Sequence, residues 1–133
     1  MSLSVTNNYV GIPFIDGGRS LKGADCWGII KLMYADLFDF ELPDYQISAF
    51  QTEKVIVTME KEASRKWVQV KEPIFGDVVA MANHPRHRDR VNHVGFYLQK
   101  GRFLHAMKET GSIISRVAEI GSPKIIGIYR WAR

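Results

Sequence analysis

The chain has 133 residues, of which 46% are hydrophobic and 24% are charged. This length suffices for one hydrophobic core, and the composition is that of an ordinary globular protein, so we expect a single domain over residues 1–133. The net charge of +4 and the isoelectric point of 9.3 favour polyanionic partners in general. The basic residues are dispersed and form no motif with interleaved aromatic residues, so we do not expect nucleic-acid binding.

The sequence also limits membrane association and cysteine chemistry. No apolar run approaches the ~20 residues of a membrane-spanning helix, and the first residues lack the layout of a secretion signal. We therefore expect synthesis in the cytoplasm and no membrane partner. The single cysteine, Cys26, excludes an internal disulfide and a multi-thiolate zinc site. It is either a small buried apolar residue or a reactive thiol.

Two helices are predicted in the first half of the chain. Turn formers dominate the residues before Cys26, where an apolar stripe at helical spacing begins and runs to about Phe38. Asp25 stands where an N-cap is expected. Residues 51–64 are a second helix candidate, although a run of three β-branched residues within them weakens this prediction.

Strands are predicted in the second half, where short apolar runs are separated by glycine and charged residues. Helices followed by strands predict an α+β fold, in which a small antiparallel sheet packs against the helix that begins at Cys26. The expected strands are 78–81, 91–98, 103–107, 113–117 and 125–131.

Cys26 has surroundings that favour chemistry. A thiol in the first turn of a helix lies near unpaired N–H groups and the positive end of the helix dipole, and both favour the thiolate. Gly23 and Gly28 permit tight turns and close approach of a substrate. A lone cysteine is more commonly a packing residue, but the flanking glycines and Asp25 argue against deep burial here.

Two histidines complete the candidate site. Strand alternation places His93, Gly95 and Tyr97 on one face, and His105 lies in the next expected strand. If these strands form a hairpin, the two imidazoles meet and supply a base and a group that orients it. Each histidine alone suggests a half-buried strand residue, whereas both together with Cys26 predict a Cys-His-His triad.

A metal site is the competing interpretation of the histidines. His84 and His87 could join His93 as ligands, but three arginines in the same segment would repel a cation and Asp89 is its one carboxylate. We therefore expect a solvated basic loop, no metal ligands and no cofactor.

Taken together, these segments resemble the signature of the NlpC-type cell-wall peptidases, a papain-like family that acts on bacterial peptidoglycan. The similarity follows the family's order and spacing over nearly the whole chain. Only residues 46–70 and 108–124 have no counterpart in the family pattern. The segments that carry it are Tyr9-Val10-Gly11-Ile12-Pro13-Phe14, Gly17-Gly18, Gly23-Ala24-Asp25-Cys26-Trp27-Gly28, 38–43, Gly76-Asp77-Val78-Val79, His93-Val94-Gly95-Phe96-Tyr97, Leu104-His105-Ala106 and Gly127-Ile128-Tyr129-Arg130.

This resemblance implies a papain-like, NlpC-type fold and a cysteine peptidase. Cys26 would attack an amide carbonyl, His93 would activate the thiol and protonate the leaving amine, and His105 would hold the His93 ring. The implied substrate is the stem peptide of peptidoglycan, cleaved between D-glutamate and a diamino acid.

The resemblance also implies substrate-binding positions at Asp25, Gly18, Trp27 and Tyr9. In relatives the position of Asp25 helps to hold the free amine of the stem peptide's L-alanine. Its other interpretation is a simple helix cap, and the sequence weights the two equally.

One departure from the family pattern concerns Phe14, where members commonly have a tyrosine whose hydroxyl helps to stabilise the oxyanion. Losing one such donor typically costs ~10²–10³ in rate. Tyr9 or Tyr97 would then have to replace it, or the Cys26 N–H would contribute more.

Two further features resemble tail-associated members of the family that phages and prophages encode: the lack of an accessory wall-binding domain, and Trp27 directly after the nucleophile. Phage tail proteins are therefore a second expected class of partner, and the site of action would be the cell wall or a phage particle. A structural tail component with a vestigial site, and acyl transfer or amide hydrolysis on another substrate, stay open beside peptidoglycan hydrolysis.

Overall fold

The computed structural model describes residues 6–45, 47–118 and 123–132. Both expected helices and all five expected strands are present, with ends shifted by at most two residues. Within the described ranges, no helix is long and apolar enough to cross a membrane. The elements are η1 (Asn7–Tyr9), β1 (Arg19–Ser20), β2 (Gly23–Ala24), α2 (Cys26–Phe38), α3 (Thr52–Ala63), β3 (Trp67–Gln69), β4 (Val78–Ala82), β5 (His93–Tyr97), β6 (Arg102–Met107), β7 (Gly111–Arg116) and β8 (Lys124–Trp131).

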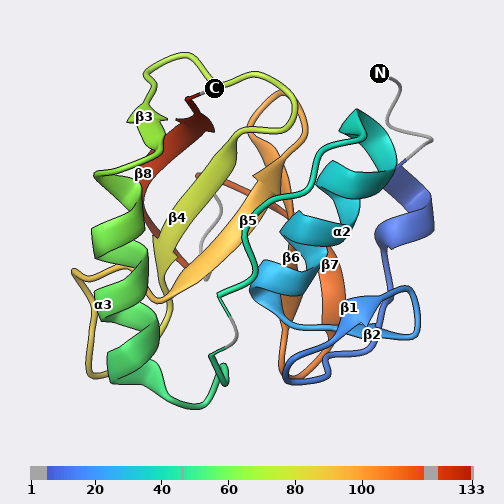
Figure 1. The fold of residues 1–133 in the computed structure, drawn as a ribbon, viewed down its shortest axis with the longest axis horizontal. Helices are drawn as coiled ribbons and strands as arrows, with labels where there is room; N and C mark the ends of the chain where they lie inside the picture. The colour runs from blue at the N-terminus through green and yellow to red at the C-terminus, as the bar shows by residue number, and fades with distance from the viewer. Residues whose placement is uncertain (1–5, 46, 119–122, 133) are drawn as a thin grey trace.

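The fold is α+β, as predicted. Six strands form one antiparallel sheet in the order β3-β8-β4-β5-β6-β7, and β1 and β2 form a separate two-stranded hairpin. Figure 1 shows α2 lying next to β5 and β6, while α3 lies beside β4 and β8. The first residue of α2 is therefore close to the central strands of the sheet.

Capping and burial explain the position of α2. The extended backbone of Asp25 turns its carboxylate onto the Gly28 N–H, which caps the first turn. Ile29, Ile30 and Met33 are fully buried on the face of α2 that packs on the sheet. This apolar face anchors the helix, so its N-terminus has a fixed place at the sheet.

The β5–β6 hairpin brings the two histidine strands together. Phe96 pairs with Leu104, and the turn uses positive φ angles at Lys100 (53°) and Gly101 (74°). Gly95 is required for this packing, because a Cβ there would lie 2.9 Å from the Phe103 ring and 3.3 Å from the His105 Cβ. The bare backbone at Gly95 leaves room for the side chain of His105.

The chain before α2 is fixed to the far edge of the sheet and to the helix. The buried Ser112 hydroxyl of β7 donates to the Tyr9 carbonyl and accepts from the Ile12 N–H. Gly18 lies so close to the β2 backbone that a Cβ would be 2.4 Å from the Gly23 carbonyl oxygen. These contacts hold the N-terminal segment beside the start of α2.

Candidate active site

Cys26 is the first residue of α2, and its side chain is partly buried. The backbone N–H groups of Val94 and Trp27 act on its sulfur as hydrogen-bond donors. Since Val94 follows His93, the thiol lies against the beginning of β5. Cys26 and His93 both line one cavity of about 230 Å³, which we call the Cys26 cavity.

His93 belongs to a chain of hydrogen-bonding side chains that crosses three strands. Its Nε2 lies 2.8 Å from Nδ1 of His105, and Nε2 of His105 lies 2.9 Å from the Ser115 hydroxyl. Both rings are buried, with exposed fractions of 4% for His93 and 1% for His105. The predicted meeting of the two imidazoles is confirmed.

One tautomeric arrangement makes this chain suited to base catalysis. A proton on Nε2 of His93 donates to Nδ1 of His105, whose own Nε2–H then donates to the Ser115 oxygen. Nδ1 of His93 is left with a lone pair that can accept the thiol proton. The chain thus fixes the ring of His93 and leaves its other nitrogen available.

Burial keeps both histidines neutral. It lowers the pKa of His93 from 6.5 to about 3, with smaller contributions from His105 and the positive charge of Lys108. Burial likewise lowers the pKa of His105 to about 4. Both rings are therefore uncharged at neutral pH.

Burial of the sulfur opposes the ionisation that the helix N-terminus favours. Burial raises the pKa of Cys26 to about 12, and the negative charge of Asp25 adds to this effect. The N–H groups of Val94 and Trp27 and the Arg19 charge lower the pKa, but they do not outweigh desolvation. These shifts favour a neutral thiol and a neutral imidazole before substrate binds.

One helix and two connections contribute walls of the Cys26 cavity. Thr52 and Val55 come from the start of α3, Asn92 from the β4–β5 connection, and Lys108 from the turn after β6. Two smaller cavities of about 60 Å³ each continue between α2 and α3. The Cys26 cavity is thus bounded by α3 and by the residues that follow β4 and β6.

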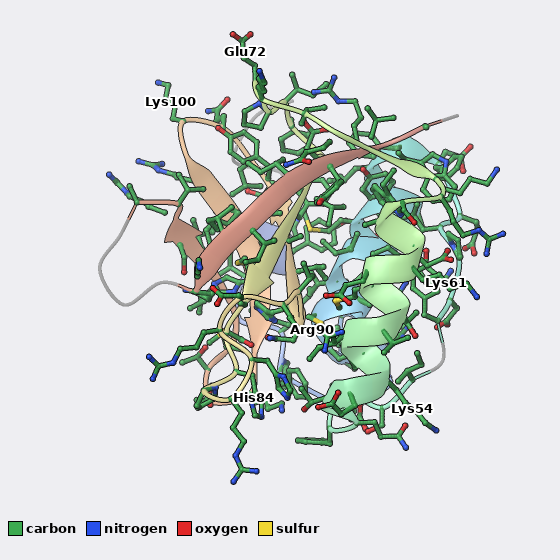
Figure 2. The ribbon with its side chains drawn as sticks, turned by 90° about the vertical axis from the view of Figure 1, so that its left-hand side faces the viewer. Lys54, Lys61, Glu72, His84, Arg90 and Lys100 are labelled. Atoms are coloured by element: carbon green, nitrogen blue, oxygen red, sulfur yellow. The ribbon has the colours of Figure 1, made fainter. Side chains whose placement is uncertain are left out.

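An ion pair and a polar contact join α3 to the β4–β5 connection. Arg90 makes two hydrogen bonds to Glu60, at 2.8 and 3.1 Å, and Nε2 of His87 lies 3.1 Å from Glu53. Figure 2 shows Arg90 against α3, with His84 on the same connection. These contacts hold the two walls of the cavity together.

Comparison with known proteins decides the family. The model of the NlpC/P60 family matches residues 11–127, which include Cys26, His93 and His105. The chain belongs to the NlpC/P60 family. This match confirms the resemblance that the sequence motifs carry.

Named relatives and solved structures agree with this assignment. The chain is 30% identical over 112 residues to the murein DD-endopeptidase MepS/murein LD-carboxypeptidase of Escherichia coli K12, covering 84% of this chain and 51% of that protein. It is 28% identical over 131 residues to the gamma-DL-glutamyl hydrolase of Bacillus subtilis. That match covers 92% of this chain and 27% of the hydrolase. The NlpC/p60 domain of the peptidoglycan hydrolase SagA has the same fold, with a TM-score of 0.61, 18% identity and 92% coverage of each chain. The chain spans about half the length of the first of these relatives.

Asp25 is fully engaged within this NlpC/P60 domain. Its carboxylate accepts from the N–H groups of Gly17 and Gly28 at 2.9 and 2.8 Å and from Arg19 at 2.8 Å, and its exposed fraction is 3%. Three donors leave little capacity for a ligand amine. The geometry favours the helix-cap interpretation over amine binding.

The other expected substrate-binding residues also make contacts within the fold, although Trp27 lines a small cavity together with Cys26. Trp27 packs against the Tyr45 and Trp67 rings, and its indole N–H donates to the Pro43 carbonyl at 2.8 Å. Gly18 permits the close approach of the β1–β2 hairpin described above. The Tyr9 hydroxyl donates to Asp36, ten residues along the chain from Cys26.

Neither tyrosine considered as a replacement for the missing hydroxyl is at the site. Tyr9 bonds to Asp36, and the Tyr97 hydroxyl accepts from the Gly101 N–H in the turn at the far end of β5. Phe14 itself lines the Cys26 cavity and packs edge-on against Phe50, with ring centres 6.3 Å apart. At position 14 the cavity is therefore lined by an apolar ring that carries no hydroxyl.

The histidines of the β4–β5 connection have other partners. His84 Nδ1 accepts from the Arg86 N–H, and His87 contacts Glu53. Among the residues that the structure describes, no group of three or more His, Cys, Asp or Glu side chains is arranged to hold a metal ion.

Two residues near Cys26 and the paired histidines, Ser115 and Lys108, were not among the predicted site residues. Ser115 reaches His105 because it pairs with Phe103 across β6 and β7. Strand alternation could have placed Ser115 and Ile113 on one face, but the pairing register is not visible in the sequence. Lys108 lies three residues after His105 and belongs to none of the sequence motifs.

Proposed function

We propose that this chain is a cysteine peptidase that hydrolyses an amide bond in the stem peptides of peptidoglycan. The observation that carries the proposal is the arrangement of Cys26 and His93 on one cavity, with His93 held by His105 at 2.8 Å. The names of the relatives from Escherichia coli and Bacillus subtilis support hydrolysis of murein or glutamyl amides. We infer that the scissile bond joins D-glutamate to a diamino acid.

In this mechanism the thiol is activated when substrate binds. His93 takes the proton of Cys26 at Nδ1 as the sulfur attacks the carbonyl carbon, so the two charges form together and attract each other. The imidazolium then gives this proton to the leaving amine, and a thioester remains on Cys26. Water, deprotonated by the same nitrogen, hydrolyses the thioester and regenerates the thiol. His105 acts as a positioning residue that stabilises the charged His93 ring.

Backbone donors at the start of α2 would stabilise the oxyanion. The first N–H groups of a helix have no intrahelical acceptor, so the Cys26 N–H is available to an oxygen bound beside the sulfur. Phe14 offers no hydroxyl for this task. We therefore expect slower turnover than in a member with tyrosine at this position, by a factor of ~10².

Digestion of purified sacculi and of a synthetic stem tetrapeptide tests the proposal, with mass analysis of the products. The wild-type chain should release fragments that end at D-glutamate, and Cys26→Ala and His93→Ala should release none. Equal product from wild type and Cys26→Ala, or none from either, would overturn it.

A second candidate function is a structural part of a phage tail whose site binds the wall without cleaving it. The phenylalanine at position 14 favours this alternative, because it offers no hydroxyl to an oxyanion in the Cys26 cavity. In that case the chain should co-purify with tail proteins, and Cys26→Ala should leave particle assembly unchanged. Muropeptide cleavage by the wild-type chain would eliminate this alternative.

A further inference from the structure

Lys108 lies at the edge of the Cys26 cavity, just beyond the end of β6. Its side chain lines the same cavity as Cys26 and His93. The ammonium nitrogen lies 4.4 Å from the centre of the Phe50 ring, and Phe50 packs against Phe14 on the same rim. A cation held over an aromatic face has a restricted position, so the Lys108 charge is held at this edge of the cavity.

The charge of Lys108 is available to a ligand. Among residues 6–45, 47–118 and 123–132, no carboxylate lies within 4.0 Å of its ammonium nitrogen. Its field also reaches His93, whose pKa it helps to lower. The cation therefore lies near the reacting groups, and Glu109, which also lines the cavity, is the neighbouring negative charge.

We propose that Lys108 determines specificity by binding a free carboxylate on the substrate residue next to the scissile amide. This inference rests on the proposed function, because a γ-linked D-glutamate keeps its α-carboxylate free and a diamino acid such as diaminopimelate carries a second carboxylate on its side chain. An ammonium group forms charge-assisted hydrogen bonds to a carboxylate, and it loses this attraction when the carboxylate is an amide. The preferred substrate is therefore an acid rather than an amidated stem peptide.

Kinetics on two synthetic stem peptides, one with free carboxylates and one amidated at both positions, tests this inference. Lys108→Met should raise KM for the acid peptide about tenfold, leave kcat nearly unchanged and leave the amidated peptide unaffected. Lys108→Arg should restore most of the preference. Lys61→Met is the matched control, because it removes one exposed positive charge on the outer side of α3 (Figure 2). It should change KM and kcat for neither peptide. If Lys108→Met lowered kcat/KM equally for both peptides, or for neither, the inference would be overturned.

A binding measurement separates failure of this inference from failure of the proposed function. Calorimetry of the two peptides with Cys26→Ala, and with the same variant carrying Lys108→Met, needs no turnover. The acid peptide should bind about tenfold more weakly when Lys108 is absent, even if the wild-type chain cleaves neither peptide. Identical affinities in the two variants would contradict a role for Lys108, whatever the outcome of the digestion.

Discussion

Cys26 and His93 are each held uncharged by burial, although the helix N-terminus favours a thiolate. The N–H groups and the dipole at the start of α2 act on the sulfur, but loss of water has the larger effect on its pKa. The same loss of water disfavours the imidazolium of His93. Proton transfer between them becomes favourable only when the substrate's developing negative charge is also present.

The pH dependence of Cys26 alkylation tests the resting state. With a pKa near 12 the thiolate fraction should rise about tenfold per pH unit from pH 6 to pH 9, with no plateau. Asp25→Asn removes the second cause of the raised pKa and keeps an oxygen for the Gly28 N–H, so it should speed labelling by iodoacetamide at every pH. A fast, flat rate below pH 7 would instead indicate a preformed thiolate–imidazolium pair.

Substitution of His105 tests its positioning role. His105→Gln should lower kcat about 10²-fold with little change in KM, because it removes the group that orients and stabilises the charged His93 ring. Ser115→Ala should lower kcat only a few-fold, since it removes a partner one step further from the thiol. Steady-state kinetics on a stem peptide, normalised to folded protein by circular dichroism, would measure both. A His105→Gln variant with unchanged kcat would contradict the role.

At the scale of elements, local signals predicted the helices and strands well. The apolar stripe and Asp25 predicted α2 from its cap to Phe38, and alternation predicted the β5–β6 hairpin that joins His93 to His105. The two-residue strands β1 and β2 lie in a turn-rich segment and have no periodicity to detect. The Tyr9–Asp36 hydrogen bond and the Ser115–His105 contact depend on tertiary packing and register, so no local pattern could have predicted them.

Removal of the α2 cap should destabilise the fold. Asp25→Ala eliminates three hydrogen bonds to a buried carboxylate, so the free energy of unfolding should fall by about 3 kcal/mol. Asp44→Ala is the control, because it also loses a contact with Arg19 but at a partly exposed side chain, and it should cost less than about 1 kcal/mol. Urea unfolding measures both changes. Similar losses in the two variants would show that Asp25 is not the main cap.

For the whole molecule, the proposed catalytic site lies where α2, the central strands and the connections around them meet. Residues between 11 and 127 belong to one NlpC/P60 unit, and the antiparallel sheet with α2 on it matches the papain-like fold that the motifs implied. A single domain over residues 1–133 stays a prediction, as does a phage origin, because the chain spans about half of its curated relatives. The cavity walls formed by α3 and by the turn after β6 belong to segments that match no family motif, so the sequence did not predict them.

Two buried neutral histidines should make global stability fall in mild acid. Their pKa values of about 3 and 4 lie below the ordinary 6.5, so below pH 6.5 the unfolded chain binds protons that the folded chain does not. As the pH falls from about 6 to about 4, each histidine should therefore lower the free energy of unfolding by up to about 1.4 kcal/mol per pH unit. Above pH 7 the contribution of the neutral histidines to stability is fully present. Urea unfolding at pH 7, 6 and 5 should give a shallower slope for His105→Gln than for wild type. Identical slopes would mean that His105 titrates normally in the folded chain.

The central claim is that Cys26 becomes covalently acylated by a stem peptide. Rapid mixing with a stem tetrapeptide, quenching in acid and intact-protein mass spectrometry measures this step directly. We predict an adduct with the mass of the fragment up to D-glutamate, located on Cys26 and absent from Cys26→Ala. Products released by the wild-type chain with no such adduct at any mixing time, or the same adduct on Cys26→Ala, would contradict the account.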